Sequence, residues 1–277
     1  MEYRLVTDSC CELIPELRED LKAESVPMTL EIDGETFIDD ESIDLPRFLA
    51  AIRASKNVAK SACPSPEMFA EKFRLSKECF GLTITSKLSG SYNSAQIASK
   101  LVINEDPTRR VHIFDSLSAS AGEIAVGLKI RECVQAGLDF DGIVTKVSAF
   151  IQEMKTFFIL ENLDTLIKSG RMSRIVGYVA SAMSLRPIMT AEQGTIKLQE
   201  KARGSVRAFT RLVEIIGENC TDFAERTLVI THCNNERQAN FLRAEAQKRY
   251  SFKAIHVVPT AGLSSMYANE GGVIIAF

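Results

Sequence analysis

Hydrophobic positions follow two alternating spacings along the first half of the chain. Short apolar runs of strand length alternate with longer stretches in which apolar residues recur every three or four positions, a pattern that predicts strands and helices of a mainly parallel sheet. The predicted strands are Tyr3–Thr7, Ser25–Leu30, Glu35–Ile38, Gly81–Thr85 and Val111–Phe114. The predicted helices are Leu45–Ala54, Ser65–Arg74, Ser94–Val102, Ala119–Gln135 and Asp141–Glu153.

The second half shows a different order of elements. The apolar run Thr156–Leu160 precedes a short helix at Leu163–Lys168, a glycine break and a further helix through about Ser184. A hairpin is expected from Pro187 to Leu198, because a glycine turn joins two runs of strand-like residues. The remaining predicted elements are the helix Ser205–Cys220, the strand Thr227–Thr231, the helix Glu236–Tyr250, the strand Ala254–Val258 and the strand Gly272–Phe277.

These patterns predict an α/β protein of two domains. Residues 1–149 are expected to form a mainly parallel sheet with flanking helices, and residues 150–277 a mixed α/β sheet domain. A length of 277 residues suits two ordinary domains, and a hydrophobic share of 45% is sufficient for a buried core. No low-complexity linker marks the boundary.

Charge and cysteine content exclude several classes of protein. A net charge of −3 gives no indication of binding to nucleic acid or to an anionic membrane surface. The first residues show no signal-peptide pattern, and no apolar run approaches the roughly 18 residues of a spanning helix. We therefore expect a cytoplasmic protein without stable membrane insertion. The seven cysteines lack zinc-site spacing, which predicts reduced thiols and no metal.

One loop carries the strongest indication of a binding site. The apolar run Phe80–Ile84 leads into a loop with three serines and a glycine, and a predicted helix follows. Ser89, Gly90 and Ser91 therefore lie where an α/β sheet presents hydrogen-bond donors to an anionic ligand. The loop contains no acid, base or metal ligand, which favours binding of an anionic group over its chemical conversion. Helix capping and turn formation are the alternative role of these residues.

Two further polar segments extend this interpretation. In the segment Lys60–Pro66, helix capping accounts for Ser65 and Pro66 but leaves Ser61 as a candidate ligand. Lys168, Arg171 and Arg174 surround a glycine break, where they form either a solvated surface or a patch that binds phosphate or a partner.

Motifs of common enzymes are missing. The chain has neither GxGxxG nor GxSxG, and the glycines at 122 and 127 have P-loop spacing without the required lysine. The only histidines, His112, His232 and His256, do not have the spacing of a known serine triad. No catalytic residue is therefore assigned; the alternative is an autonomous hydrolase or transferase that uses Ser89 or His232.

Several segments together resemble one known family over essentially the whole chain. In order they are Thr7-Asp8-Ser9, Ser61–Pro66, Ser89–Tyr92, Phe114–Ser116, Leu163–Ser173 and Arg186–Ile188. They resemble the DegV family of bacterial fatty-acid-binding proteins. This resemblance implies a two-domain α/β protein that encloses one long-chain fatty acid in an internal tunnel, with no other cofactor.

The resemblance also implies the following roles. The hydroxyl groups of Ser61 and Ser89 would bind the carboxylate, and such proteins serve as the binding subunit of a fatty acid kinase. They present the carboxylate to a separate ATP-using subunit, and the acyl phosphate passes toward phospholipid synthesis, with an acyltransferase as a further partner. Lys168, Arg171 and Arg174 match the family's basic segment and are expected to dock the kinase subunit.

Three positions depart from the family pattern. Ser61 stands where the family commonly has threonine, Cys63 where glutamine is usual, and Asn269 in the place of the histidine in a C-terminal motif. Asn269 can donate a hydrogen bond to a carboxylate but cannot carry a proton or a positive charge. These departures keep open a carrier or sensor of another amphipathic ligand that has no kinase partner.

Overall fold

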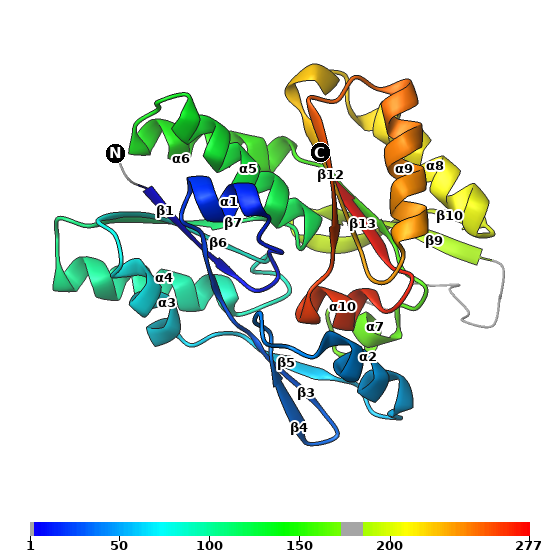
Figure 1. The fold of residues 1–277 in the computed structure, drawn as a ribbon, viewed down its shortest axis with the longest axis horizontal. Coiled ribbons are helices and arrows are strands. Elements are labelled where there is room, and N and C mark those ends of the chain that lie inside the picture. Colours follow the sequence, from blue (N-terminus) through cyan, green and yellow to red (C-terminus); the bar gives the residue numbers. More distant parts are fainter. Residues whose placement is uncertain (1–2, 173–184) are drawn as a thin grey trace.

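The computed structural model describes residues 3–172 and 185–277, which form three sheets with flanking helices. Sheet A has the strand order β2-β1-β6-β7, and all of its neighbouring strands are parallel, as predicted (Figure 1). Its strands are β1 (Tyr3–Asp8), β2 (Glu24–Val26), β6 (Glu78–Thr83) and β7 (Arg110–Asp115). Because they are parallel, the carboxyl ends of β1, β6 and β7 meet at one edge of the sheet.

Helices cover both faces of sheet A because its strand side chains alternate between the two faces. Leu5 of β1 belongs to the core under one group of helices, whereas the next residue, Val6, belongs to the core under the other group. The first group contains α1 (Pro15–Asp20), α5 (Ala121–Gln135) and α6 (Phe140–Glu153). The second group contains α3 (Pro66–Phe73) and α4 (Ser91–Glu105), and Figure 1 shows the two groups on opposite sides of the sheet.

Sheet C is mixed and has the order β10-β9-β8-β13-β11-β12, in which only β11 and β12 are parallel neighbours. Its strands are β8 (Thr156–Ile159), β9 (Leu185–Glu192), β10 (Thr195–Arg203), β11 (Thr227–His232), β12 (Ala254–Pro259) and β13 (Val273–Ala276). Helices α8 (Ser205–Asn219) and α9 (Glu236–Arg249) cover one face of this sheet. This arrangement confirms the mixed α/β sheet predicted for the second half.

Sheet B was not predicted as a separate unit. It is antiparallel, with β3 (Thr29–Ile32) between β4 (Glu35–Ile38) and β5 (Lys60–Ala62). Helix α2 (Leu45–Ala54) follows β4. The predicted strand Ser25–Leu30 was wrong, because its residues divide between β2 of sheet A and β3 of sheet B around Pro27, which has no backbone N–H for a sheet ladder.

Helix α5 joins the two larger sheets, because it contacts β6 of sheet A and both β11 and β13 of sheet C. Gly127 also lets α5 pack closely against α1, because a Cβ atom at this position would lie 2.8 Å from a methyl carbon of Leu17. The division at residue 149 stays a prediction, and α6 runs across that position.

The remaining short elements are α7 (Asp164–Lys168), a 3-10 turn at Phe223–Glu225 and α10 (Gly262–Ala268). The helix expected through about Ser184 lies outside the described residues. Among the helices of the described part of the chain, none has the length and apolar character that a membrane-crossing helix needs.

Candidate functional site

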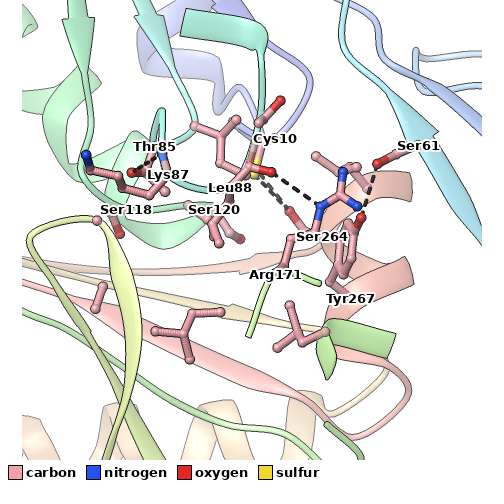
Figure 2. Close-up of a pocket in the computed structure, with 18 of the residues that line it drawn as sticks. Cys10, Ser61, Thr85, Lys87, Leu88, Ser118, Ser120, Arg171, Ser264 and Tyr267 are labelled. Carbon is pink, nitrogen blue, oxygen red and sulfur yellow. Dashed lines mark hydrogen bonds between the residues drawn. The ribbon is translucent and has the colours of Figure 1, made fainter. Parts of the chain in front are cut away.

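A cavity of about 730 Å³ lies where sheets A and C approach α10 and the short strand β5. Its volume is within the usual range for small-molecule sites. The labelled side chains in Figure 2 extend from Thr85, Lys87 and Ser118 at one end to Ser61 and Tyr267 at the other. The cavity is therefore elongated, and its walls come from both halves of the chain.

Apolar side chains form much of the wall contributed by the second half. Side chains on β8 again alternate: Phe157 packs toward α8, whereas Phe158 lines the cavity. Further apolar lining residues from this half are Leu160, Leu166, Ala191, Ile196, Leu263, Ala268 and Ile274. This wall has the chemistry that an acyl chain or another apolar ligand segment requires.

Hydroxyl groups of Ser61, Ser89 and Tyr267 also line the cavity. Ser61 on β5 and Tyr267 on α10 share a hydrogen bond of 3.1 Å, although they lie 206 residues apart in sequence. Ser89 lines the cavity from the loop before α4, and its Oγ accepts a hydrogen bond from the Ser91 amide at 3.2 Å. The Ser89 hydroxyl can therefore direct its own proton toward a bound anion.

Gly90 brings the loop before α4 close to the segment after β5. A Cβ atom at this position would lie 3.1 Å from the sulfur of Cys63, which is a tight contact. Gly90 and Cys63 both line the cavity, as does Ser61. The structure thus brings Ser61, Ser89 and Gly90 together at one cavity, as a shared binding site requires.

Arg171 lies in the cavity wall, where its guanidinium donates from Nη1 to the Ser169 carbonyl at 2.8 Å and from Nε to the Leu88 carbonyl at 3.4 Å. The sequence interpretation had grouped Arg171 with Lys168 and Arg174 as a docking patch. Lys168 is exposed and lies 3.7 Å from the Asp164 carboxylate, whereas Arg174 is outside the described residues. The structure therefore separates Arg171, a cation beside the cavity, from Lys168 on the surface.

Two predicted carboxylate ligands do not line the cavity. Ser91 is fully buried and donates from Oγ to Asp8 Oδ2 at 2.5 Å. The Asn269 amide donates to the backbone carbonyls of Tyr267 at 3.3 Å and Asn162 at 3.5 Å. These positions do not support the prediction that Ser91 and Asn269 contact the ligand carboxylate directly, and that prediction stays untested.

The sequence interpretation missed several lining residues. Tyr267 and Ser264 lie on α10, a short helix with no clear periodicity, and Cys10 follows β1. Ser118 and Ser120 lie in the segment before α5, and the Ser118 hydroxyl is 2.7 Å from the hydroxyl of Thr156. The only signal in the sequence was the density of serines after Asp115.

The alternative catalytic residues named from the sequence are Ser89 and His232. His232 is not a lining residue; its Nδ1 accepts the Asn235 amide at 3.3 Å, and burial lowers the pKa of its imidazole. The described residues contain no group of three or more histidine, cysteine or acidic side chains placed to hold a metal ion. Hydroxyl groups beside a guanidinium are suited to binding an anion.

Buried carboxyl groups lie behind the cavity. Burial raises the pKa of Asp8 to about 6 and the pKa of Glu12 to about 7. Burial also raises the pKa of Asp39 and Glu123, and the charges of Asp8 and Glu12 add to the effect on Glu123. The native protein therefore binds protons in a pH range in which the unfolded chain has released them.

These shifts predict that the free energy of unfolding decreases as the pH rises from about 4.5 to about 7. Asp106, whose pKa is lowered by hydrogen bonds from Lys77 and Thr108, loses its stabilising effect only below this range. Thermal denaturation should give a higher Tm at about pH 5 than at about pH 8, and Glu12→Gln should reduce the difference. A Tm that rises steadily over this interval would contradict the assignment.

Comparisons with known proteins place this geometry in a family. A family model described as "Uncharacterised protein, DegV family" matches residues 2–277. A DegV domain-containing protein of Streptococcus gordonii is 33% identical over 280 residues, covering 100% of this chain and 99% of that protein. The chain belongs to the DegV family.

Solved structures of related proteins share the fold. A DegV family protein from Ruminococcus gnavus, described with vaccenic acid, has a TM-score of 0.95 and 36% identity, covering 100% of both chains. The Fatty Acid Kinase (Fak) B3 protein of Streptococcus pneumoniae, loaded with linoleic acid, has a TM-score of 0.93 and 32% identity, covering 100% of this chain and 99% of that chain. The DegV-like fold expected from the sequence is confirmed.

Proposed function

We propose that this protein binds one long-chain fatty acid in the cavity, with the carboxylate at the end formed by Ser61 and Ser89. The observation that carries this proposal is a single cavity that combines apolar lining side chains with the hydroxyl groups of Ser61, Ser89 and Tyr267 beside the guanidinium of Arg171. The fatty acids bound by the similar proteins from R. gnavus and S. pneumoniae support the same class of ligand.

The carboxylate can be bound by donors from three separate segments. The Ser89 hydroxyl donates directly, and either hydroxyl of the hydrogen-bonded pair Ser61 and Tyr267 can direct its proton to the ligand while it accepts from the other. Arg171 supplies positive charge from the adjacent wall. These donors and the positive charge of Arg171 therefore balance the negative charge of the carboxylate without any contribution from Asn269.

The acyl chain supplies most of the affinity. About 14 methylenes removed from water contribute roughly 11 kcal/mol at about 0.8 kcal/mol each, before entropy costs. A hydrogen bond to a charged group contributes only about 1.5–3 kcal/mol. The head-group residues then act mainly by fixing which end of the ligand lies at Ser61 and Ser89. We further propose that residues 1–149 supply the head-group loops and residues 150–277 cover the chain.

A calorimetric titration of delipidated protein with palmitate tests this function. One palmitate should bind per protein, with a negative heat-capacity change that reports burial of the apolar chain. An absence of binding, or binding of several molecules with no defined stoichiometry, would argue against a single enclosed site.

The presented carboxylate suggests a role beyond storage. We propose that this protein is the non-catalytic binding subunit for a fatty acid kinase, which uses ATP to convert the carboxylate into an acyl phosphate. Its likeness to Fak B3 supports this role. The competing function, a carrier or sensor of another amphipathic ligand, predicts no acyl phosphate when fatty acid, a kinase catalytic subunit and ATP are added.

Charge reversal of Lys168 is expected to separate docking from ligand binding. Because Lys168 is exposed and does not line the cavity, Lys168→Glu should leave palmitate affinity unchanged. It should lower acyl phosphate formation about tenfold at limiting kinase concentration, since one unfavourable charge pair costs on the order of 1.4 kcal/mol. Lys248→Glu is the matched control, because Lys248 is also a surface helix lysine paired with an acidic neighbour. Equal rates for both variants would remove Lys168 from the docking surface.

A further inference from the structure

We propose that Asp8 is a positioning residue for the carboxylate-binding loop and that it acts through Ser91. This inference rests on the proposed function. It also assigns a role to the Thr7-Asp8-Ser9 segment, which does not itself supply a head-group donor. Asp8 ends β1 and is fully buried, whereas the loop it would position follows β6, the neighbouring strand in sheet A.

The Asp8 carboxylate holds both ends of this loop. Its Oδ2 accepts hydrogen bonds from the Ile84 amide at 3.1 Å and from the Ser91 hydroxyl at 2.5 Å. Ile84 precedes the loop and Ser91 begins α4, so the two contacts enclose the segment that carries Ser89. The Ser91 amide in turn donates to Ser89 Oγ at 3.2 Å. Ser91 therefore connects the two residues: its side chain donates to Asp8, and its amide donates to Ser89, the proposed ligand contact.

The surroundings of Asp8 favour ionisation of the Asp8 carboxyl over ionisation of the Glu123 carboxyl. Glu123 of α5 is fully buried beside Asp8; burial, and then the charge of Asp8, raise the pKa of the Glu123 carboxyl. Two adjacent buried carboxyl groups do not readily ionise together. Asp8 also accepts the Cys10 amide at 3.1 Å, so its three donors stabilise the anion, whereas Glu123 retains its proton.

Other titratable groups around this pair do not reverse that assignment. Glu12 adds negative charge that raises the pKa of Glu123, and burial keeps the thiols of Cys10 and Cys11 protonated. Arg18 acts on Cys11 with an opposite but smaller effect. A single negative charge on Asp8 is therefore consistent with every group facing it, and this charge strengthens the contact with Ser91.

Ser9, the residue after Asp8, connects the end of β1 to helix α10. Ser9 donates to Asp39 at 2.7 Å, and Asp39 accepts the amides of Gly262 and Leu263 at 2.8 and 3.0 Å. These amides begin α10, which carries Tyr267. The end of β1 is thus connected by hydrogen bonds both to the loop that carries Ser89 and to the helix that carries Tyr267.

Ser91→Ala tests the inference, with Ser99→Ala as its matched control. Both serines are buried on α4 and each donates one side-chain hydrogen bond, but Ser99 donates to Val111 and not to Asp8. Each variant is measured for Tm and for binding of palmitate and of hexadecanol, which has the same chain length without a carboxylate. Wild-type protein in the same assay tests the proposed function separately.

Ser91→Ala should weaken palmitate binding about tenfold and leave hexadecanol binding within about twofold. Ser99→Ala should change neither affinity, even if both variants lose similar thermal stability. Equal losses for the two ligands would show a general packing defect and overturn the positioning role, as would unchanged palmitate affinity. Failure of the wild-type protein to bind palmitate would instead overturn the proposed function and this inference with it.

Asp8→Asn provides a readout that does not depend on the ligand. The substituted side chain would keep the shape of the aspartate but lose its charge, so amide hydrogen exchange between residues 84 and 91 should become faster in the apo protein. Exchange in the second half of α4 should not change. Unchanged exchange in residues 84–91 would overturn the role of Asp8 as the anchor of this loop.

Discussion

Replacement of both Ser61 and Ser89 by alanine is expected to weaken palmitate binding at least about 100-fold. Each hydroxyl contributes about 1.5–3 kcal/mol when it bonds to a charged group, and the loss of both therefore exceeds about 3 kcal/mol. Neither residue belongs to the main hydrophobic clusters, so the fold should remain intact. Calorimetry or competition with a fluorescent fatty acid measures the change.

A double variant at Ser42 and Ser55 is the appropriate control. Both hydroxyls form surface hydrogen bonds with aspartates, and neither residue lines the cavity. Ser42→Ala with Ser55→Ala removes the same number of hydroxyl groups and should leave palmitate affinity unchanged. If the Ser61/Ser89 variant bound palmitate as tightly as this control, the carboxylate would have to lie elsewhere.

Shortening the ligand from 16 to 10 carbons is expected to weaken binding by about a thousandfold or more. Six methylenes at about 0.8 kcal/mol each correspond to roughly 5 kcal/mol of lost transfer free energy. The wall formed by Phe158, Leu160 and Ile274 then loses ligand contacts, while the head-group contacts are retained. A series of saturated fatty acids in one competition assay measures the slope per methylene.

The slope distinguishes an enclosed chain from one that lies on the surface. Constant affinity from 10 to 16 carbons would contradict burial of the chain in the cavity, whatever the head-group variants show. Combining the short ligand with the Ser61/Ser89 variant should give additive losses, since the two ends of the ligand make separate contacts.

Helices and strands in which hydrophobic residues recur at a regular spacing were predictable from the sequence. Helix α2 was predicted at its observed bounds, and β1, β6 and β7 of sheet A were found because buried parallel strands are short apolar runs between helices. The polar strand β5 and the short helix α10 were missed, because neither has enough residues to show a period. Their stability comes from tertiary contacts, such as the pairing of Ser61 with Leu30 of β3.

The candidate site was only partly predictable for a related reason. Ser61 and Ser89 stood out because capping and turn chemistry did not fully account for them. Tyr267 and Arg171 could not be placed at the cavity, since their positions depend on packing between segments far apart in the chain. Arg171 shows this most clearly: its neighbours in sequence indicated a surface patch, whereas its contact with Leu88 places it in the cavity wall.

Native mass spectrometry of freshly purified protein, followed by denaturing extraction and lipid identification, tests the central claim most directly. The account predicts one long-chain fatty acid per protein, lost on denaturation and recovered intact in the extract. A mass equal to that of the bare chain, combined with no mass increase after incubation with palmitate, would contradict fatty acid binding in the cavity.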